Sequence, residues 1–158
     1  MEPERPLTHI GEDGSPRMVD VGGKPETQRE AVAEAFVRMS GETLDAVKAG
    51  AGAKGDVFTT SRLAGIMGAK KTSELIPLCH PLSLDDIDVS TEVTDEGIVI
   101  TSRVKTTART GVEMEALTAA TIAALTVYDM CKSVDKGISI ENVRLVKKSG
   151  GKSGDWER

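Results

Sequence analysis

Residues 110–137 of this sequence, TGVEMEALTAATIAALTVYDMCKSVDKG, decide its fold. Thr110 can cap the start of a helix, acidic residues follow in the first turn where the helix dipole favours anions, and Gly137 is a natural stop. The residues between them are rich in Ala, Leu and Met, which are strong helix formers. The sequence therefore predicts one long helix over roughly residues 112–134.

The segments around this helix predict an α+β protein. Residues 28–39 alternate apolar and polar side chains as a strand does, although their Ala and Glu content suits a helix; we interpret them as a strand. Further strands are expected over 17–21, 84–93, 98–105 and 138–146, and further helices over 42–48 and 57–70, capped by Ser40 and Asp56. In the second of these helices an apolar stripe is expected to face the core: Val57, Leu63, Ala64 and Met67. This mixture favours an antiparallel sheet with helices packed on one face.

The size of the chain indicates one domain. It has 158 residues, of which 39% are hydrophobic, and this is enough for one core. No internal repeat or linker divides it, so we expect a single domain over residues 1–158. Residues 1–17, rich in charge, Gly and Pro, are expected to form a mobile arm, and residues 148–158 a flexible basic tail.

Composition argues against several classes of protein. Aromatic residues are 3% of the chain and the formal net charge is -5, which is unlike a nucleic-acid binder. No apolar run approaches the ~20 residues that span a bilayer, and the polar N-terminus lacks a signal-peptide stretch. Two cysteines, Cys79 and Cys131, do not make a disulfide framework. We therefore expect a cytoplasmic protein with no membrane or nucleic-acid partner.

The first candidate for chemistry is the segment 77–81, PLCHP, in which prolines restrain the backbone around His80. His9 falls in the expected arm. Imidazole can act as an acid, a base or a hydrogen-bond donor near neutral pH. A histidine that satisfies backbone groups in a tight turn is the alternative, and the segment alone leaves both open. Cys79, His80 and Cys131 are too few and wrongly spaced for a metal site.

The second candidate is the pair Asp129 and Lys132 on the long helix. Their i,i+3 spacing puts both side chains on one face, where they can form an ion pair. An ordinary surface pair is the alternative. Val127, Met130 and Cys131 make this part of the helix mostly apolar, and partly buried charges there would have tunable pKa values, as acid–base chemistry needs.

The third candidate is the acidic first turn of the same helix. Glu113 and Asp129 are sixteen positions apart, roughly 24 Å at ~1.5 Å per residue. They cannot serve one small-molecule site within one subunit. If both are functional, the helix packs antiparallel against its copy in a two-fold dimer. Small residues are expected to permit that approach: Ala116, Ala119, Ala120, Ala123 and Ala124.

Scattered cations could hold a phosphate against the acidic background. Lys54 precedes a helix N-terminus, a place suited to phosphate. Residues 148–154, KSGGKSG, are basic and Gly-rich, so their backbone could wrap an anion, but they lack the glycine spacing and following helix of a P-loop. The further candidates are Lys70, Lys71, Lys148, Lys152, Arg29 and Arg109.

Taken together, these segments resemble the MoaC family, the cyclic pyranopterin monophosphate synthase accessory proteins of molybdenum-cofactor synthesis. The resemblance rests on residues 7–10 (LTHI), 18–21 (MVDV), 54–58 (KGDVF), 74–82 (ELIPLCHPL), 110–118 (TGVEMEALT), 128–132 (YDMCK) and 148–154 (KSGGKSG). It covers nearly the whole chain.

The resemblance implies a ferredoxin-like fold assembled as a hexamer, a trimer of dimers, with the active site at the dimer interface. It implies a lyase that converts (8S)-3′,8-cyclo-7,8-dihydroguanosine 5′-triphosphate to cyclic pyranopterin monophosphate and pyrophosphate. No cofactor is required on this reading, although Mg²⁺ could arrive with the triphosphate.

The resemblance also implies roles for particular residues. The catalytic candidates are Asp129, Lys132, Lys54 and His80. The substrate-binding candidates are Leu78, Cys79, His80, Met114, Glu115, Glu113 and Lys148, and we add Arg29 from the cations above. Two other functions remain as alternatives: a non-catalytic nucleotide-binding module, and a metal-dependent GTP cyclohydrolase using Cys79 and His80.

Overall fold

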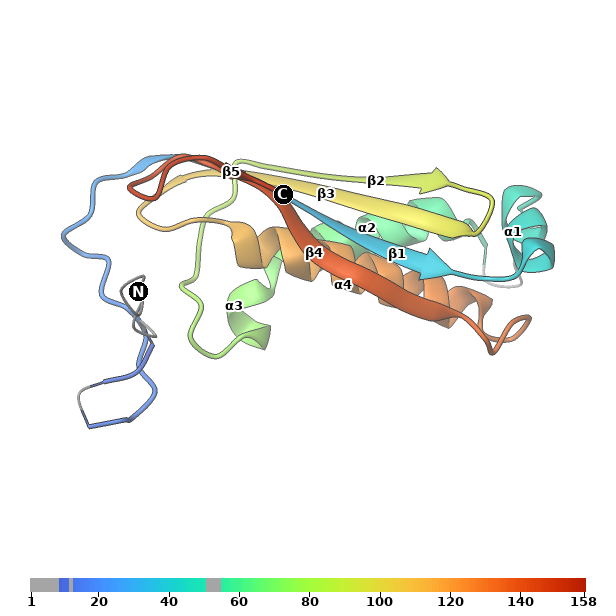
Figure 1. Ribbon diagram of the computed structural model, residues 1–158, viewed down its shortest axis with the longest axis horizontal. Helices are drawn as coiled ribbons and strands as arrows, with labels where there is room; N and C mark the ends of the chain where they lie inside the picture. The colour runs from blue at the N-terminus through green and yellow to red at the C-terminus, as the bar shows by residue number, and fades with distance from the viewer. Residues whose placement is uncertain (1–8, 12, 51–54) are drawn as a thin grey trace, which may run out of the picture.

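The computed structural model describes residues 9–11, 13–50 and 55–158, and these form a five-stranded antiparallel sheet with helices packed on one face (Figure 1). The elements are β1 (Thr27–Arg38), α1 (Gly41–Lys48), α2 (Val57–Lys70), α3 (Thr72–Leu75), β2 (Asp86–Val93), β3 (Gly97–Ala108), α4 (Glu113–Cys131), β4 (Ser139–Ser149) and β5 (Trp156–Glu157). The predicted α+β class is confirmed.

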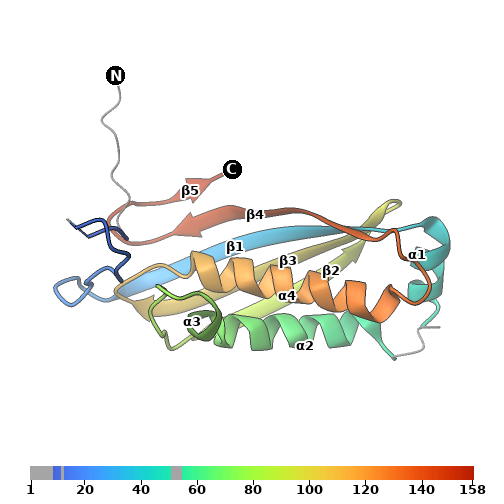
Figure 2. The same cartoon turned by 90° about the horizontal axis from the view of Figure 1, so that it is seen from below.

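The strand order is β2-β3-β1-β4-β5, and every neighbouring pair is antiparallel. The first crossover runs from β1 through α1, α2 and α3 to β2, and β3 lies between these two strands. The second crossover runs from β3 through α4 to β4, and β1 lies between these two strands. Two such interleaved crossovers are the ferredoxin-like arrangement. Figure 2 shows α2 and α4 side by side beneath the sheet, with α1 at one end.

The alternation in β1 sets the two faces of the sheet. Ala31, Ala33, Ala35 and Val37 are buried beneath the helices, and the residues between them lie on the other face. The interpretation of this stretch as a strand is confirmed. Burying every second side chain against the helices outweighs the helix propensity of its Ala and Glu residues. The opposite face carries ion pairs between strands: Arg38–Glu141, Lys105–Glu30, Arg103–Asp86 and Arg144–Glu34. Arg38 also pairs with Glu96 in the turn between β2 and β3.

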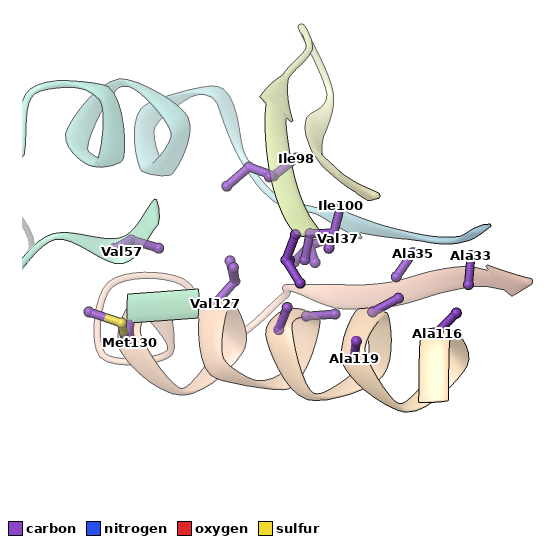
Figure 3. Packing of buried hydrophobic residues seen from close by; sticks show 14 of the residues in the cluster. Ala33, Ala35, Val37, Val57, Ile98, Ile100, Ala116, Ala119, Val127 and Met130 are labelled. Carbon is purple, nitrogen blue, oxygen red and sulfur yellow. The ribbon is translucent and has the colours of Figure 1, made fainter. Parts of the chain in front are cut away.

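The small residues of α4 pack inside the subunit. The side chains of Ala116, Ala119, Ala120, Ala123 and Ala124 are fully buried against the sheet and α2. Figure 3 shows Ala116, Ala119 and Val127 on the side of α4 that faces the strands. The expectation that this alanine surface meets a partner's helix is therefore wrong. The alanines of β1 let α4 approach the sheet closely, and this contact within the subunit occupies the alanine surface of α4.

The apolar stripe predicted on α2 is also wrong in part. Val57 is buried, but the side chains of Leu63 and Met67 are 57% and 59% exposed. The buried side of α2 instead carries Gly65 and Gly68, together with Ser61 and Ala69. A Cβ on Gly65 would lie 3.0 Å from the Ala119 carbonyl oxygen, and one on Gly68 would lie 2.9 Å from the Ile122 side chain. Close packing of α2 against α4 requires small residues on the buried side of α2, so Leu63 and Met67 lie on its exposed side.

The helix boundaries follow local chemistry except at α4. The Ser40 side chain accepts from the Thr43 N–H, and Asp56 from Thr59, so both predicted caps are confirmed. The expected cap at Thr110 is wrong: Val112 occupies the N-cap of α4, with no side-chain cap among the described residues. The helix also ends at Cys131 and not near 134, because the chain tightens there into a turn closed by Val134 N–H to the Cys131 carbonyl.

Both ends of the chain differ from the prediction where the structure describes them. Within the described residues, 17–21 pair with no strand, and the nearest bridge joins Ile10 to Pro16. Residues 1–8 and 12 of the expected mobile arm lie outside the described residues. In the expected flexible tail over 148–158, the first two residues end β4, and β5 pairs back onto that strand through Lys148 and Trp156. The flexibility of this tail stays a prediction.

We expect Gly65→Ala to lower the free energy of unfolding by about 1 kcal/mol or more. Overpacking against the Ala119 carbonyl costs about 1–3 kcal/mol and outweighs the gain of up to about 1 kcal/mol in helix propensity. Urea denaturation followed by circular dichroism measures the change. Gly41→Ala is the matched control, since nothing lies within 4 Å of its Cβ position, and its stability should not fall. A Gly65→Ala variant more stable than the parent would contradict the close packing.

Candidate active site

A small hollow lies at the N-terminal end of α4. Its volume is about 130 Å³, and it is lined by His9, Leu78, Cys79, His80, Leu82, Thr110, Gly111, Glu113, Met114 and Glu115. The loop that follows α3 supplies the Cys79–His80 wall, and the first turn of α4 supplies the carboxylates. The structure thus brings together the two segments whose residues are expected to line the substrate.

Glu115 is the buried acid of this hollow. Its side chain faces inward with only 4% of the residue exposed. Burial, and to a lesser extent the charge of Glu113, raises the pKa of Glu115 to about 7. Burial also raises the pKa of the Cys79 thiol, and Glu115 adds to that shift. A carboxyl that is partly protonated near neutral pH can both donate and accept a proton.

His80 is fixed by the backbone of a distant segment. Its Nε2 lies 2.8 Å from the Val19 carbonyl oxygen. A carbonyl oxygen only accepts hydrogen bonds, so Nε2 carries the proton, and in the neutral ring Nδ1 is left as an acceptor. The sequence left two alternatives for His80: it satisfies a backbone group, or it acts in a site. The geometry allows both, because one ring nitrogen binds the Val19 carbonyl and His80 also lines the hollow.

An ion pair joins the end of β4 to the first turn of α4. Lys148 Nζ lies 3.0 Å from Glu113 Oε1, and both side chains are mostly buried. The same ammonium lies 3.5 Å from the Ser153 hydroxyl. The basic segment after β4 is therefore anchored to the wall of the hollow.

A second, wider hollow adjoins the first and is lined by cations. It has a volume of about 810 Å³ and shares Thr110, Gly111 and Glu113 with its neighbour; its other lining residues are Lys24, Arg29, Arg109, Lys152 and Ser153. Four cations facing one Glu give a local positive field on an acidic protein. Such a hollow can hold a phosphate chain.

Two glycines pack closely against Gln28 and Arg29, the second of which lines this hollow. Gly150 and Gly151 have φ of +86° and +80°, a conformation that side chains disfavour. A Cβ on Gly151 would collide with the Arg29 guanidinium, and one on Gly150 with the Gln28 carbonyl. Arg29 Nε is buried and has no hydrogen-bond partner among the described residues. A buried donor without a partner costs free energy, so this close packing around Arg29 is not optimised for stability alone.

Some lining residues were not predicted as part of a site. Lys24 ends a turn in which its own N–H donates to the Val21 carbonyl at 3.0 Å, and it lines the wider hollow together with Arg109. His9 was assigned to the arm, yet it lines the smaller hollow. These contacts join segments far apart in sequence, so local patterns give no signal for them.

Asp129 and Lys132 lie at the opposite end of α4. Lys132 Nζ is 2.7 Å from Asp129 Oδ1, and each side chain is about half exposed, at 52% and 53%. The hydrogen bond to Asp129 raises the pKa of Lys132. Because α4 is continuous between the two ends, roughly 24 Å separates this pair from the hollows within one chain. Lys54, the other predicted catalytic residue, lies outside the described residues.

No group of three or more His, Cys, Asp or Glu side chains in the part of the chain that the structure describes is placed to hold a metal ion. No helix formed by the described residues is long and apolar enough to cross a membrane.

The fold is α+β, and its two adjoining hollows, one of them lined by cations, form a candidate site for a small molecule. The chain belongs to the MoaC family, whose model matches residues 18–151. Three curated relatives are each named cyclic pyranopterin monophosphate synthase. The relative from Novosphingobium aromaticivorans is 58% identical over 151 residues, 96% of both chains. Those from Thermomicrobium roseum and Peptoclostridium acidaminophilum are 56% and 52% identical, over 96% of this chain and 93% and 97% of their own.

We expect Glu115→Gln to change how stability depends on pH. The folded pKa, about 7, lies above the ~4.3 of an unfolded glutamate, so the folded chain binds more protons between these values. Its contribution to stability is complete below pH ~4.3 and is lost as the pH rises towards 7. The neutral amide removes this loss, so the variant should gain stability relative to the parent across that window and keep a constant difference above it.

Denaturation midpoints measured from pH 4 to 8 test this expectation. Glu42→Gln, a change at an exposed carboxylate in the first turn of α1, is the control and should not reproduce the gain between pH ~4.3 and 7. A Glu115→Gln curve that runs parallel to the parent would show that the carboxyl of Glu115 ionises as it does in the unfolded chain.

Proposed function

We propose that the chain is a cyclic pyranopterin monophosphate synthase, a lyase that converts (8S)-3′,8-cyclo-7,8-dihydroguanosine 5′-triphosphate to cyclic pyranopterin monophosphate and pyrophosphate. The observation that carries the proposal is the junction of the two hollows at the N-terminal end of α4. Proton-transfer groups line one hollow and cations line the other. High identity to relatives bearing that name, over nearly the full length, supports the same function.

The smaller hollow suits the ring chemistry. Opening the five-membered ring of the purine and closing a pyranopterin requires proton transfers to nitrogen and oxygen. Glu115, partly protonated near neutral pH, and the free Nδ1 of His80 are groups that can exchange those protons. Met114 and Leu78 offer apolar contact to the faces of the ring.

The larger hollow suits the phosphate chemistry. Forming the cyclic phosphate requires a sugar oxygen to attack the α-phosphorus while pyrophosphate leaves. Negative charge develops on the leaving group, and cations beside it lower the barrier. Arg29, Arg109 and Lys152 line the hollow in which the β- and γ-phosphates would lie. That no cofactor is required, with Mg²⁺ possible alongside the triphosphate, stays a prediction.

The proposed general acid/base, Asp129, must come from a second subunit. Within one chain it is too far from the hollows, so we infer a two-fold dimer in which Asp129 and Lys132 of one subunit complete the hollow of the other. The helix surface left exposed in one chain offers apolar contact area: Leu63, Met67, Met114 and Leu125. The trimer of dimers and the cytoplasmic location rest on the family resemblance and stay predictions.

The direct experiment incubates the protein with the cyclised nucleotide and follows the pterin by fluorescence and pyrophosphate by a coupled assay. Stoichiometric formation of both products is expected. Binding of the nucleotide with no product would favour a non-catalytic module, and activity that needs retained zinc would favour a cyclohydrolase.

We expect Asp129→Asn to reduce turnover at least a hundredfold, because the amide cannot exchange a proton, and Lys54→Ala to do the same. His80→Ala should be similarly impaired. Size-exclusion chromatography should show an unchanged assembly for each variant, since Asp129 is half exposed and its loss opens no cavity.

Mixing two inactive variants tests the shared site. When Asp129→Asn and His80→Ala chains are unfolded and refolded together, half of the dimers are mixed, and one of their two sites is intact. About a quarter of parental activity should return. Activity that stays at the level of the separate variants would mean that each site is built from one chain.

A further inference from the structure

The two histidines of the chain, His9 and His80, line one hollow although they are 71 positions apart in the sequence. We propose that His9 is a substrate-contacting residue, held at the site by the backbone pairing of residues 9–11 with residues 15–17. This inference rests on the proposed function, which it deepens by naming a group that touches the purine-derived ring.

The position of His9 is set by a closed turn. Arg17 N–H donates to the His9 carbonyl at 2.9 Å, Gly11 N–H donates to the Ser15 carbonyl at 2.8 Å, and Ile10 bridges to Pro16. The turn therefore brings the chain back beside His9. Figure 1 places this described segment at the same end of the molecule as α3 and the start of α4.

A hydrogen bond from His80 holds this turn beside the site. The chain leaves Arg17 and within two residues reaches Val19, whose carbonyl accepts the hydrogen bond from His80. His80 lies in the loop that forms the opposite wall. One hydrogen bond thus holds the segment that carries His9 against the loop that carries Cys79, and both line the same hollow.

The His9 imidazole is free to bind a ligand. It has no hydrogen-bond partner among the described residues, whereas one nitrogen of His80 is already used by the backbone. A neutral imidazole offers one donor and one acceptor, which matches the alternating N–H and C=O groups on the edge of a guanine-like ring. An exposed histidine in a surface turn is often only solvated, but this one faces a thiol, a buried carboxyl and a second imidazole.

The test uses His9→Ala and His9→Asn, with Ile10→Ala as the matched control. Ile10 is the neighbouring residue, and its side chain does not line the hollow. Formation of the pterin should fall at least tenfold in kcat/KM for His9→Ala and less for His9→Asn, which keeps a hydrogen-bonding side chain. Ile10→Ala should stay within about twofold of the parent. Added free imidazole should restore part of the activity of His9→Ala, as filling a merely structural gap would not.

A second readout is independent of turnover. Because the chain has two histidines, its imidazole carbon–proton spectrum holds two ring Cε1–Hε1 signals, which His9→Ala and His80→Ala assign. The His9 signal should shift when the cyclised nucleotide is added to Asp129→Asn protein, which should bind without converting it. Parental kcat/KM in His9→Ala, or a His9 signal that does not move at saturating nucleotide, would overturn the inference. If the parent itself forms no pterin, the proposed function fails first, and the nucleotide-dependent shift still decides whether His9 contacts a ligand.

Discussion

The contact between α4 and β1 is built from alanines on both sides, and the rest of the molecule is arranged around it. Ala31, Ala33 and Ala35 of the strand face the small side of α4, and Gly65 of α2 lets a second helix lie close to the first. Small side chains bring the backbones together, so that many weak dispersion contacts replace a few large ones. This packing leaves α4 little freedom to shift along the sheet, because the alanines of both layers are buried in a close-packed interior.

A fixed α4 in turn positions the site. Its first turn emerges at the edge where β1 begins and β4 ends, and Glu113 there meets Lys148 while Glu115 turns inward. The Gly150–Gly151 turn then folds over Arg29, a path that requires positive φ at both residues. Proton-transfer groups and cations become neighbours because one helix terminus lies between two ends of strands.

Local sequence patterns predict much of this arrangement. The alternation over 28–39, the side-chain caps at Ser40 and Asp56 and the alanine-rich helix each depend on residues a few positions apart, and each was predictable. The inward side of α2 was not, since glycine carries no hydrophobic signal and is selected by the approach of another helix. Lys24, His9 and the pairing of β5 depend on contacts between distant segments, which a single sequence does not display. The family resemblance named the segments of the site, but the turn that brings His9 to Cys79 became visible only in three dimensions.

The rigidity that organises one end of α4 also separates the two ends. A continuous helix cannot bend to bring Asp129 to its own hollow, so in the proposed dimer each site exists only while two chains are joined. Catalysis then depends on protomer concentration as well as on folding. Some apolar residues of α2 and α4 are exposed in one chain, Leu63 and Leu125 among them. In the proposed dimer, burying these side chains stabilises the association and completes the site in the same step.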